Sequence, residues 1–402
     1  MAKNQYKKEP LKNNVEEMFI GPFGSSLKNE CFVDEEDAYC MVYEQKHAIQ
    51  KTLDGKNRFV DKNKYYELKR FTIKPGDIIV SCRGTIGETF IVPENAPLGI
   101  MHPSIMKIRL KPNVYNIEYF NLLLKNRLKD YNKSANGSGI KMAISATELG
   151  KEMFPIPPMD EQQKVSKIFL TVDRLIVLRQ QQLSKLDKLV NAQFVEMFGN
   201  PVSNTMGWKS EQLVDCLQGI DNGKSFVCSN DTRQGQEPAM LKLSAVTYGV
   251  YNQKENKVLL DDTMFIKAAE VHRGDLLFTR KNTPELVGMC AYVTNTEPNL
   301  MMPDLIFRLN PNDKINAIFL WKLINHELFR EKIQNIATGS AKSMSNISKE
   351  RLGKLKIIVP PIPLQNQFAT FMERVDQQKQ TVQQSLEKLE LMKKALMQEY
   401  FG

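Results

Sequence analysis

The sequence predicts an α+β protein with two globular domains, each a curved β-sheet with helices, separated by two long helices that form an antiparallel coiled coil. Three observations lead to this fold class. Two tandem copies of one pattern fill nearly the whole chain, which predicts a pseudo-twofold internal repeat. The stretches 160–198 and 364–400 contain no Gly or Pro and carry heptad spacing. The remaining parts hold short apolar runs separated by Gly and Pro, which is typical of strands and turns.

The repeat rests on matched segments that keep their order along the chain. Segment 156–158 (Ile-Pro-Pro) matches 359–361 (Val-Pro-Pro) at a distance of 203 residues, and the turn 75–77 matches 273–275 at 198 residues. Near the start of each copy, the alignment at 199 residues pairs Val15, Met18, Gly24 and Ser26 with Val214, Leu217, Gly223 and Ser225. The predicted globular domains are therefore 1–159 and 200–363, and the predicted helices are 160–199 and 364–402.

The first long helix is predicted to begin at a capping box, with Asp160 as the N-cap and Gln163 three residues later. Apolar residues then recur in alternating steps of three and four over five heptads, which predicts a coiled-coil seam. A straight helix of this length would extend about 58 Å. Since it cannot bury its apolar stripe against one small domain, the simplest partner is the other helix. The residues predicted to form the interface are Phe169, Ile176, Leu183, Leu186, Val190, Val375, Val382, Leu386, Leu389 and Leu396.

The composition favours an anionic partner in a reducing compartment. The 402 residues include 55 Lys and Arg against 46 Asp and Glu, a formal net charge of +9, which favours nucleic acid before a membrane. We expect no membrane segment, because no run of about 18 apolar residues is present. The six cysteines include no CxxC pair, so they are expected to be free thiols in the cytoplasm, with no metal site.

Two motifs resemble catalytic signatures without meeting their requirements. The segment 219–225 resembles a phosphate-binding loop, but it has three residues between its glycines where the motif needs four. His326 and Glu327 begin like a metalloprotease helix, but the second His is missing. We therefore predict no catalytic residue. A standalone DNA-modifying enzyme and a coiled-coil scaffold without DNA readout remain as alternative functions.

Three loops in each copy combine turn residues with short hydrogen-bond donors, which suits contacts with phosphates and base edges. In the first copy they are 21–28, 82–87 and 137–141, and in the second they are 221–225, 280–283 and 338–343. The predicted DNA-binding residues are Ser26, Lys28, Arg83, Thr85, Lys141, Lys224, Ser225, Arg280, Lys281, Asn282, Lys342 and Ser343.

The ordered set of motifs resembles the specificity subunit of type I restriction-modification systems over essentially the whole chain. It includes the segments 140–145 and 342–348, each followed by Leu-Gly, a Pro-rich turn and a Gln-rich helix start at 161–163 or 365–367. The chain departs from the pattern at 282–285, where Asn-Thr-Pro-Glu stands in place of the Gly-Thr-Ile-Gly loop at 84–87.

This resemblance implies a non-catalytic reader of double-stranded DNA with two target recognition domains. It also implies two modification (methyltransferase) subunits and restriction (translocase and nuclease) subunits as partners. No cofactor is expected on this chain, and S-adenosylmethionine, ATP and Mg are expected on the partner subunits. Because the two domains carry different loops, we expect a bipartite target with an unread gap.

Overall fold

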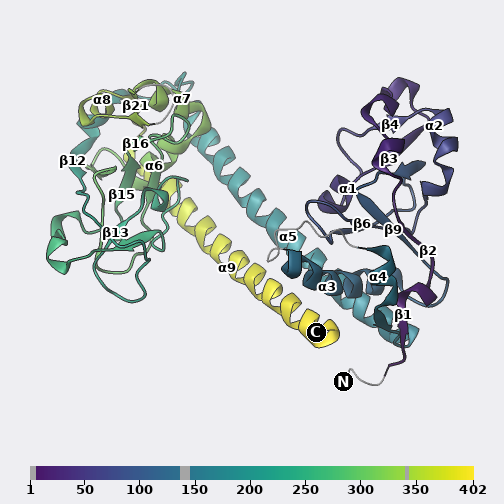
Figure 1. Cartoon of the computed structure of the whole chain (residues 1–402). Coiled ribbons are helices and arrows are strands. Elements are labelled where there is room, and N and C mark those ends of the chain that lie inside the picture. Colours follow the sequence, from purple (N-terminus) through teal and green to yellow (C-terminus); the bar gives the residue numbers. More distant parts are fainter. Residues whose placement is uncertain (1–5, 136–144, 340–343) are drawn as a thin grey trace. The chain divides into compact units, whose positions relative to one another are not determined.

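The computed structural model describes residues 6–135, 145–339 and 344–402, with backbone only for 130–135. The chain divides into two compact units, one formed by residues 1–179 with 385–402 and the other by 180–384. Each unit combines helices with antiparallel sheet (Figure 1). The α+β fold class predicted from the sequence is therefore confirmed.

The first unit is built on a four-stranded antiparallel sheet in the order β2-β9-β6-β7. Its central strand β6 is buried along its whole length, as its run of Ile, Ile and Val requires. A second sheet, of order β4-β3-β8-β5, packs small apolar clusters beside it. The elements are β1 (Lys8–Pro10), β2 (Val15–Ile20), β3 (Cys40–Tyr43), α1 (Gln45–Gln50), β4 (Phe59–Val60), α2 (Lys62–Glu67), β5 (Thr72–Ile73), β6 (Ile78–Ser81), β7 (Thr89–Ile91), β8 (Gly99–Met101), β9 (Ile105–Leu110), α3 (Ile117–Ala135), α4 (Ala146–Lys151) and β10 (Met153–Pro155).

The second unit repeats this plan with the sheet order β12-β19-β15-β17 and a smaller sheet β14-β13-β18. In both units the second sheet contains one parallel pair, β3 with β8 in the first unit and β13 with β18 in the second. The elements are β11 (Ser210–Gln212), β12 (Leu217–Asn222), β13 (Ala239–Leu241), β14 (Asn256–Val258), β15 (Leu276–Thr279), β16 (Lys281–Asn282), β17 (Cys290–Tyr292), β18 (Leu300–Met301), β19 (Ile306–Pro311), α6 (Ala317–Asn325), α7 (Glu327–Asn335), β20 (Ser345–Asn346), α8 (Lys349–Gly353) and β21 (Lys356–Ile358).

Strand pairing corrects the repeat alignment at the start of the two copies. β2 is bulged between Val15 and Glu17, and β12 is bulged in the same place between Leu217 and Gly219. Val15 therefore corresponds to Leu217, at 202 residues, and the predicted match with Val214 at 199 residues is wrong. The bulge fixes the register because it marks the same point in the ladder of both sheets.

An Asp–Arg ion pair, with Asp77 buried in the first unit and Asp275 half-buried in the second, holds the turn that enters the central strand. Asp77 accepts both guanidinium bonds of Arg109 at 2.7 Å, and Asp275 lies 3.0 Å from Nε of Arg308. The preceding glycine has positive φ in both turns, +81° and +95°, which favours a residue without a side chain. The Arg-Gly-Asp letters at 273–275 are thus a structural turn.

Two long helices complete the fold, α5 (Met159–Phe198) and α9 (Ile362–Phe401), drawn in teal and yellow in Figure 1. The predicted capping box is wrong, because α5 already includes Met159 and Asp160 lies inside its first turn. α5 ends where Gly199 adopts a left-handed φ of +72° and donates its N–H to Val195.

The ends of the long helices belong to the cores of the units. In the first unit, Phe169 near the start of α5 packs on Phe401 at the end of α9, with ring centroids 5.8 Å apart. In the second unit, Phe198 at the end of α5 packs on Phe368 near the start of α9, at 5.4 Å. All four rings are at most 7% exposed, so each helix is anchored by aromatic burial at both ends.

The two helices run antiparallel in each unit. In the first unit Lys393 pairs with Asp173, and in the second unit Lys379 pairs with Asp187, both at 2.5 Å. Within the first unit, the step from Phe169 to Asp173 moves the partner back from Phe401 to Lys393. Within the second unit, the step from Asp187 to Phe198 moves the partner back from Lys379 to Phe368, as antiparallel packing requires. The ten residues predicted for the interface are all buried or half-buried. The long helices begin at 159 and 362, slightly before their predicted starts at 160 and 364.

A buried glutamine joins each globular part to its long helix. The side chain of Gln162 donates to the carbonyls of Val114 at 3.1 Å and Pro157 at 2.8 Å, and it accepts the N–H of Asn116 at 2.8 Å. Asn116 in turn caps α3 by accepting the N–H of Tyr119.

Gln365 repeats these three bonds in the second unit. It donates to Lys314 at 3.1 Å and Pro360 at 2.7 Å, and it accepts from Asn316 at 2.8 Å. Gln162 is 1% exposed and Gln365 is 0% exposed, so neither bond set can be replaced by bulk water.

Replacing Gln162 by Leu should lower the free energy of unfolding by about 2–4 kcal/mol, because it leaves three backbone groups around a buried side chain without partners. Urea denaturation followed by circular dichroism measures this change. The matched control is Gln163→Leu, since Gln163 is the exposed neighbour on the same helix. Equal effects of the two substitutions would contradict the assigned role of Gln162.

Candidate nucleic-acid interface

In the first unit, the loops after β2 and β6 meet at the start of β9. The N–H of Gly21 donates to Ile105 at 3.0 Å, and the N–H of Cys82 donates to Ser104 at 2.9 Å. The two loops therefore leave the sheet at the same edge. The predicted residue Arg83 and the loop 21–24 line one cavity of about 440 Å³, together with Arg70, Phe71 and Pro103.

The rim of this cavity is basic and aromatic. Arg70 and Arg83 are exposed, and Phe23 is 87% exposed at the tip of its loop. The guanidinium of Arg70 lies 5.5 Å from the centre of the Phe19 ring, and such stacking orients the charge. Exposed guanidinium groups beside an apolar side chain suit contacts with phosphates and stacked bases.

Lys107 lies near the same ring, but its ammonium group already has partners within the unit. Its ammonium group is 4.6 Å from the Phe19 ring centre, pairs with Glu17 at 2.5 Å and donates to Thr72 at 2.9 Å. Burial lowers the pKa of Lys107, and the Glu17 carboxylate partly offsets this effect. With 1% exposure, Lys107 is not accessible to a ligand.

The other predicted residues of the first unit lie on the same loops. Ser26 is half-buried, and Lys28 and Thr85 are exposed. The backbone carbonyl of Thr85 accepts the hydroxyl of Ser81 at 2.6 Å, which ties the 82–87 turn to β6. Lys141 lies outside the described residues.

The second unit repeats the edge with different side chains. A glycine follows the strand in both units because a Cβ on Gly21 or Gly223 would meet a backbone carbonyl oxygen, at 2.3 or 2.1 Å. Gly223 is thus the counterpart of Gly21, whereas Gly24, its predicted counterpart, lies in open space. Lys224 and Ser225 therefore occupy the positions of Pro22 and Phe23.

Several predicted DNA-binding residues of the second unit contact other side chains of the same unit. Lys281 lies 3.7 Å from the carboxylate of Asp304, which also accepts the hydroxyl of Ser225. The guanidinium of Arg280 lies 5.0 Å from the centre of the Phe307 ring and 3.4 Å from the side-chain oxygen of Asn346. Lys224 is exposed, and its ammonium lies 5.2 Å from the centre of a neighbouring aromatic ring.

Asn282 uses both ends of its amide within the unit. It donates to the hydroxyl of Thr247 at 3.1 Å, accepts the N–H of Thr283 at 2.9 Å and is 7% exposed. Lys342 and Ser343 lie outside the described residues. The turn after β15 closes on Gly288, whose N–H donates to Thr279 as that of Gly87 donates to Ser81 in the first unit. The second turn is three residues longer than the first.

Two of the rim residues, Arg70 and Phe23, were missed by sequence reasoning. Arg70 stands in a Lys-Arg-Phe run, and alternation of basic and aromatic residues is the signal that could have found it. Within the described ranges, no group of three or more His, Cys, Asp or Glu side chains could hold a metal ion. The helices of those ranges include none that is long and apolar enough to cross a membrane.

Comparison with known proteins identifies the family to which the two copies belong. A family model described as the type I restriction modification DNA specificity domain matches residues 36–188 and 207–391, which is most of both copies. The chain belongs to this specificity family. The resemblance predicted from the sequence is thereby confirmed.

Similar proteins carry the same description. The EcoEI specificity subunit of Escherichia coli is 29% identical over 175 residues, which cover 43% of this chain and 30% of that protein. The putative MjaX specificity subunit of Methanocaldococcus jannaschii is 22% identical over 365 residues, covering 84% of this chain and 80% of that protein. The crystal structure of the S subunit from M. genitalium superimposes with a TM-score of 0.61 at 13% identity, covering 100% of this chain and 98% of that one. This likeness shows that the fold of the specificity family is shared.

Replacing Arg70 and Arg83 together by Gln should weaken DNA binding and reduce the salt dependence of the binding constant by about two units, one for each phosphate contact removed. Fluorescence anisotropy of the assembled complex on its target duplex, between about 50 and 200 mM salt, measures the slope. Lys388→Gln, on the exposed face of α9, is the control. A slope equal to that of the parent would remove both arginines from the interface.

Proposed function

We propose that this chain is the DNA-reading subunit of a type I restriction-modification assembly, and that each unit reads its own half of a bipartite double-stranded target. One observation carries the proposal: the same pair of loops leaves the same sheet edge in both units, but with different side chains. The first unit presents Phe23, Arg70 and Arg83, whereas the second presents Lys224, Arg280 and a longer turn. Since direct readout depends on which donors reach the base edges, the two half-sites should differ.

In this proposal the chain is not an enzyme. Its exposed Arg, Lys and Ser side chains would bind phosphates and bases, and methyl transfer and cleavage would be carried out by other subunits. S-adenosylmethionine, ATP and Mg would be bound by those subunits and not by this chain. The proposal places the assembly in the cytoplasm, where its DNA is.

The partners proposed are two modification subunits and the restriction subunits. The exposed side of α5 supports a protein partner, because Leu170, Val177 and Leu178 are each 48–52% exposed. Apolar side chains grouped in this way on a helix commonly mark an interaction surface.

Replacing residues 1–159 with the same region of a related chain should change one half of the methylated site and leave the other half unchanged. The reason is that each unit carries a complete loop pair on its own sheet. Methylome sequencing of cells that carry the parent or the hybrid chain reads both halves directly. Exchanging 200–363 is the matched control and should change the opposite half.

Two outcomes would contradict the proposal. If the hybrid changed both halves, or if the site proved continuous, the two units would not read independently. If the assembled complex gave no sequence-selective protection of DNA, a scaffold without readout would be the better function.

The purified chain alone should neither methylate nor cleave DNA when supplied with S-adenosylmethionine, ATP and Mg, because the proposal assigns those reactions to partner subunits. Incorporation of labelled methyl groups and agarose electrophoresis measure the two activities. Turnover by the chain alone would revive the standalone enzyme.

A further inference from the structure

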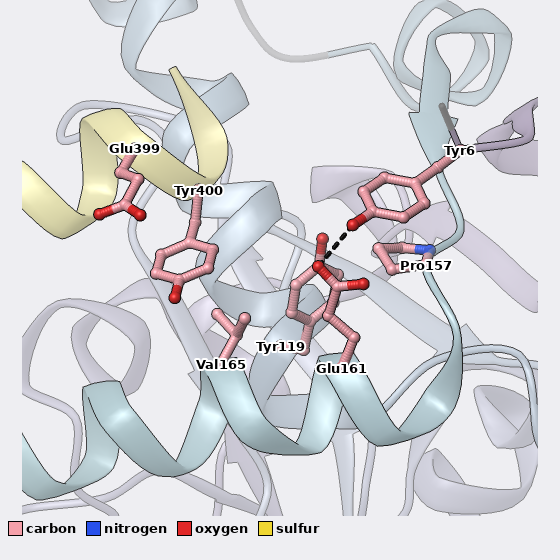
Figure 2. Close-up of a pocket in the computed structure, with 7 residues that line it drawn as sticks. All are labelled: Tyr6, Tyr119, Pro157, Glu161, Val165, Glu399 and Tyr400. Atoms are coloured by element: carbon pink, nitrogen blue, oxygen red, sulfur yellow. Dashed lines mark hydrogen bonds between the residues drawn. The ribbon is translucent and has the colours of Figure 1, made fainter. Parts of the chain in front are cut away.

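The first unit contains a second, smaller cavity between the start of α5 and the end of α9 (Figure 2). Its volume is about 120 Å³, which is room for one small polar group. It lies among residues that sequence reasoning did not assign to DNA binding. The cavity, here called the Tyr–Glu pocket, is lined by Tyr6, Tyr119, Pro157, Glu161, Val165, Glu399 and Tyr400.

The polar groups of the Tyr–Glu pocket are mostly acceptors. The hydroxyl of Tyr6 donates to Oε1 of Glu161 at 2.5 Å, as the dashed line in Figure 2 marks. This bond raises the pKa of Tyr6 to about 12, so the phenol stays neutral. The second carboxylate, that of Glu399, is exposed and forms no ion pair within the described ranges.

Tyr119 supplies an independent sign of a missing ligand. It is only 4% exposed, and its hydroxyl has no hydrogen-bond partner among the residues that the structure describes. Figure 2 shows its ring beside the side chain of Glu161. Burial and the neighbouring Glu161 carboxylate raise the pKa of Tyr119, so it remains a neutral hydroxyl facing the pocket.

The charge of the pocket selects the ligand. Two carboxylates and three tyrosine rings line it, and no Lys or Arg is among the lining residues. A guanidinium or ammonium group donates several hydrogen bonds to such acceptors, and its charge is attracted to the faces of aromatic rings. A cation therefore complements the acceptor groups that line the pocket.

The second unit lacks this pocket chemistry at the same place in its fold. Strand and helix registers place Trp208 at the position of Tyr6, Phe319 at that of Tyr119 and Leu364 at that of Glu161. Trp208 and Leu364 pack against the core of the second unit, and Phe319 is part of it. The fold does not require polar residues here, so the pocket is a special feature of the first unit.

We propose that the Tyr–Glu pocket binds the side chain of an arginine or lysine presented by another subunit of the assembly. The inference rests on the proposed function in that it places the chain in such an assembly, but it does not depend on DNA readout. The pocket would fix the first unit to a basic residue of its partner, a contact that the second unit cannot make.

A titration of the chain alone tests the ligand chemistry. The probes are N-acetyl-arginine methylamide, the matching lysine amide, the neutral citrulline amide and putrescine, added to protein with ¹³C-labelled tyrosine rings. The ring signals of Tyr6, Tyr119 and Tyr400, assigned with Tyr→Phe variants, should shift and saturate with the cationic amides and stay unmoved with citrulline. The tighter of the two cationic amides identifies the side chain.

A matched pair of variants tests the partner. Glu399→Gln should weaken arginine-amide binding and the affinity for the co-expressed partner subunits about tenfold each, because charge-assisted hydrogen bonds are about twice as strong as neutral ones. Glu196→Gln, at the equivalent exposed position of α5 in the second unit, should leave both affinities unchanged. Both residues are exposed, so neither change should affect folding, which circular dichroism verifies.

Four results would overturn the inference. They are the absence of any tyrosine shift at saturating arginine amide, equal binding of citrulline amide, tighter binding of putrescine than of either amide, and an unchanged subunit affinity for Glu399→Gln. The third would make the pocket a polyamine site. None of these results would alter the half-site changes expected from exchanging the domains, so the pocket and the DNA role fail separately.

Discussion

Two buried glutamines connect the globular part of each unit to its long helix. Gln162 and Gln365 each bond to the turn before a long helix, to the loop before α3 or α6, and to the asparagine that caps that shorter helix. The direction in which each long helix leaves its globular part is therefore set by three short bonds in a dry environment. The burial of the helix ends and the antiparallel packing of α5 and α9 depend on that direction.

The frame and the exposed loops of each unit are separate in physical terms. The Asp–Arg pairs, the bulged edge strands and the glycines in contact with carbonyl oxygens recur in both units and are directed inward. The loops after the edge strand and the central strand are held at their bases by backbone bonds and, after β6 and β15, by the hydroxyls of Ser81 and Thr279. Side chains on those loops can differ without breaking a frame contact, which suits a fold that presents two different surfaces.

Much of the fold could be predicted from the sequence, because it is encoded by spacing. Heptads, paired prolines and Gly-Asp turns repeat at visible distances, and the family resemblance follows from their order. Features set by tertiary contacts could not be predicted. The local capping pattern predicts Asp160 as the N-cap of α5, whereas the helix already includes Met159. The sequence alignment pairs Gly24 with Gly223 by residue type alone. The close approach of a backbone carbonyl shows that Gly21 is the counterpart of Gly223. Asn282 has the chemistry of a base reader, yet its amide bonds to Thr247, far away in sequence. Arg70 and Phe23 join Arg83 only through the pairing of strands.

The division of the chain has a consequence for its synthesis. Residues 180–384 form one continuous unit, whereas the first unit includes both residues 1–179 and residues 385–402. Phe169 meets its aromatic partner Phe401 only when the last turn of α9 has been made, and Asn126 bonds to the carbonyl of that same residue. On a ribosome, the domain that is translated first is thus the one completed last. Until then its apolar α5 face stays open, and contacts between residues so distant in sequence form slowly.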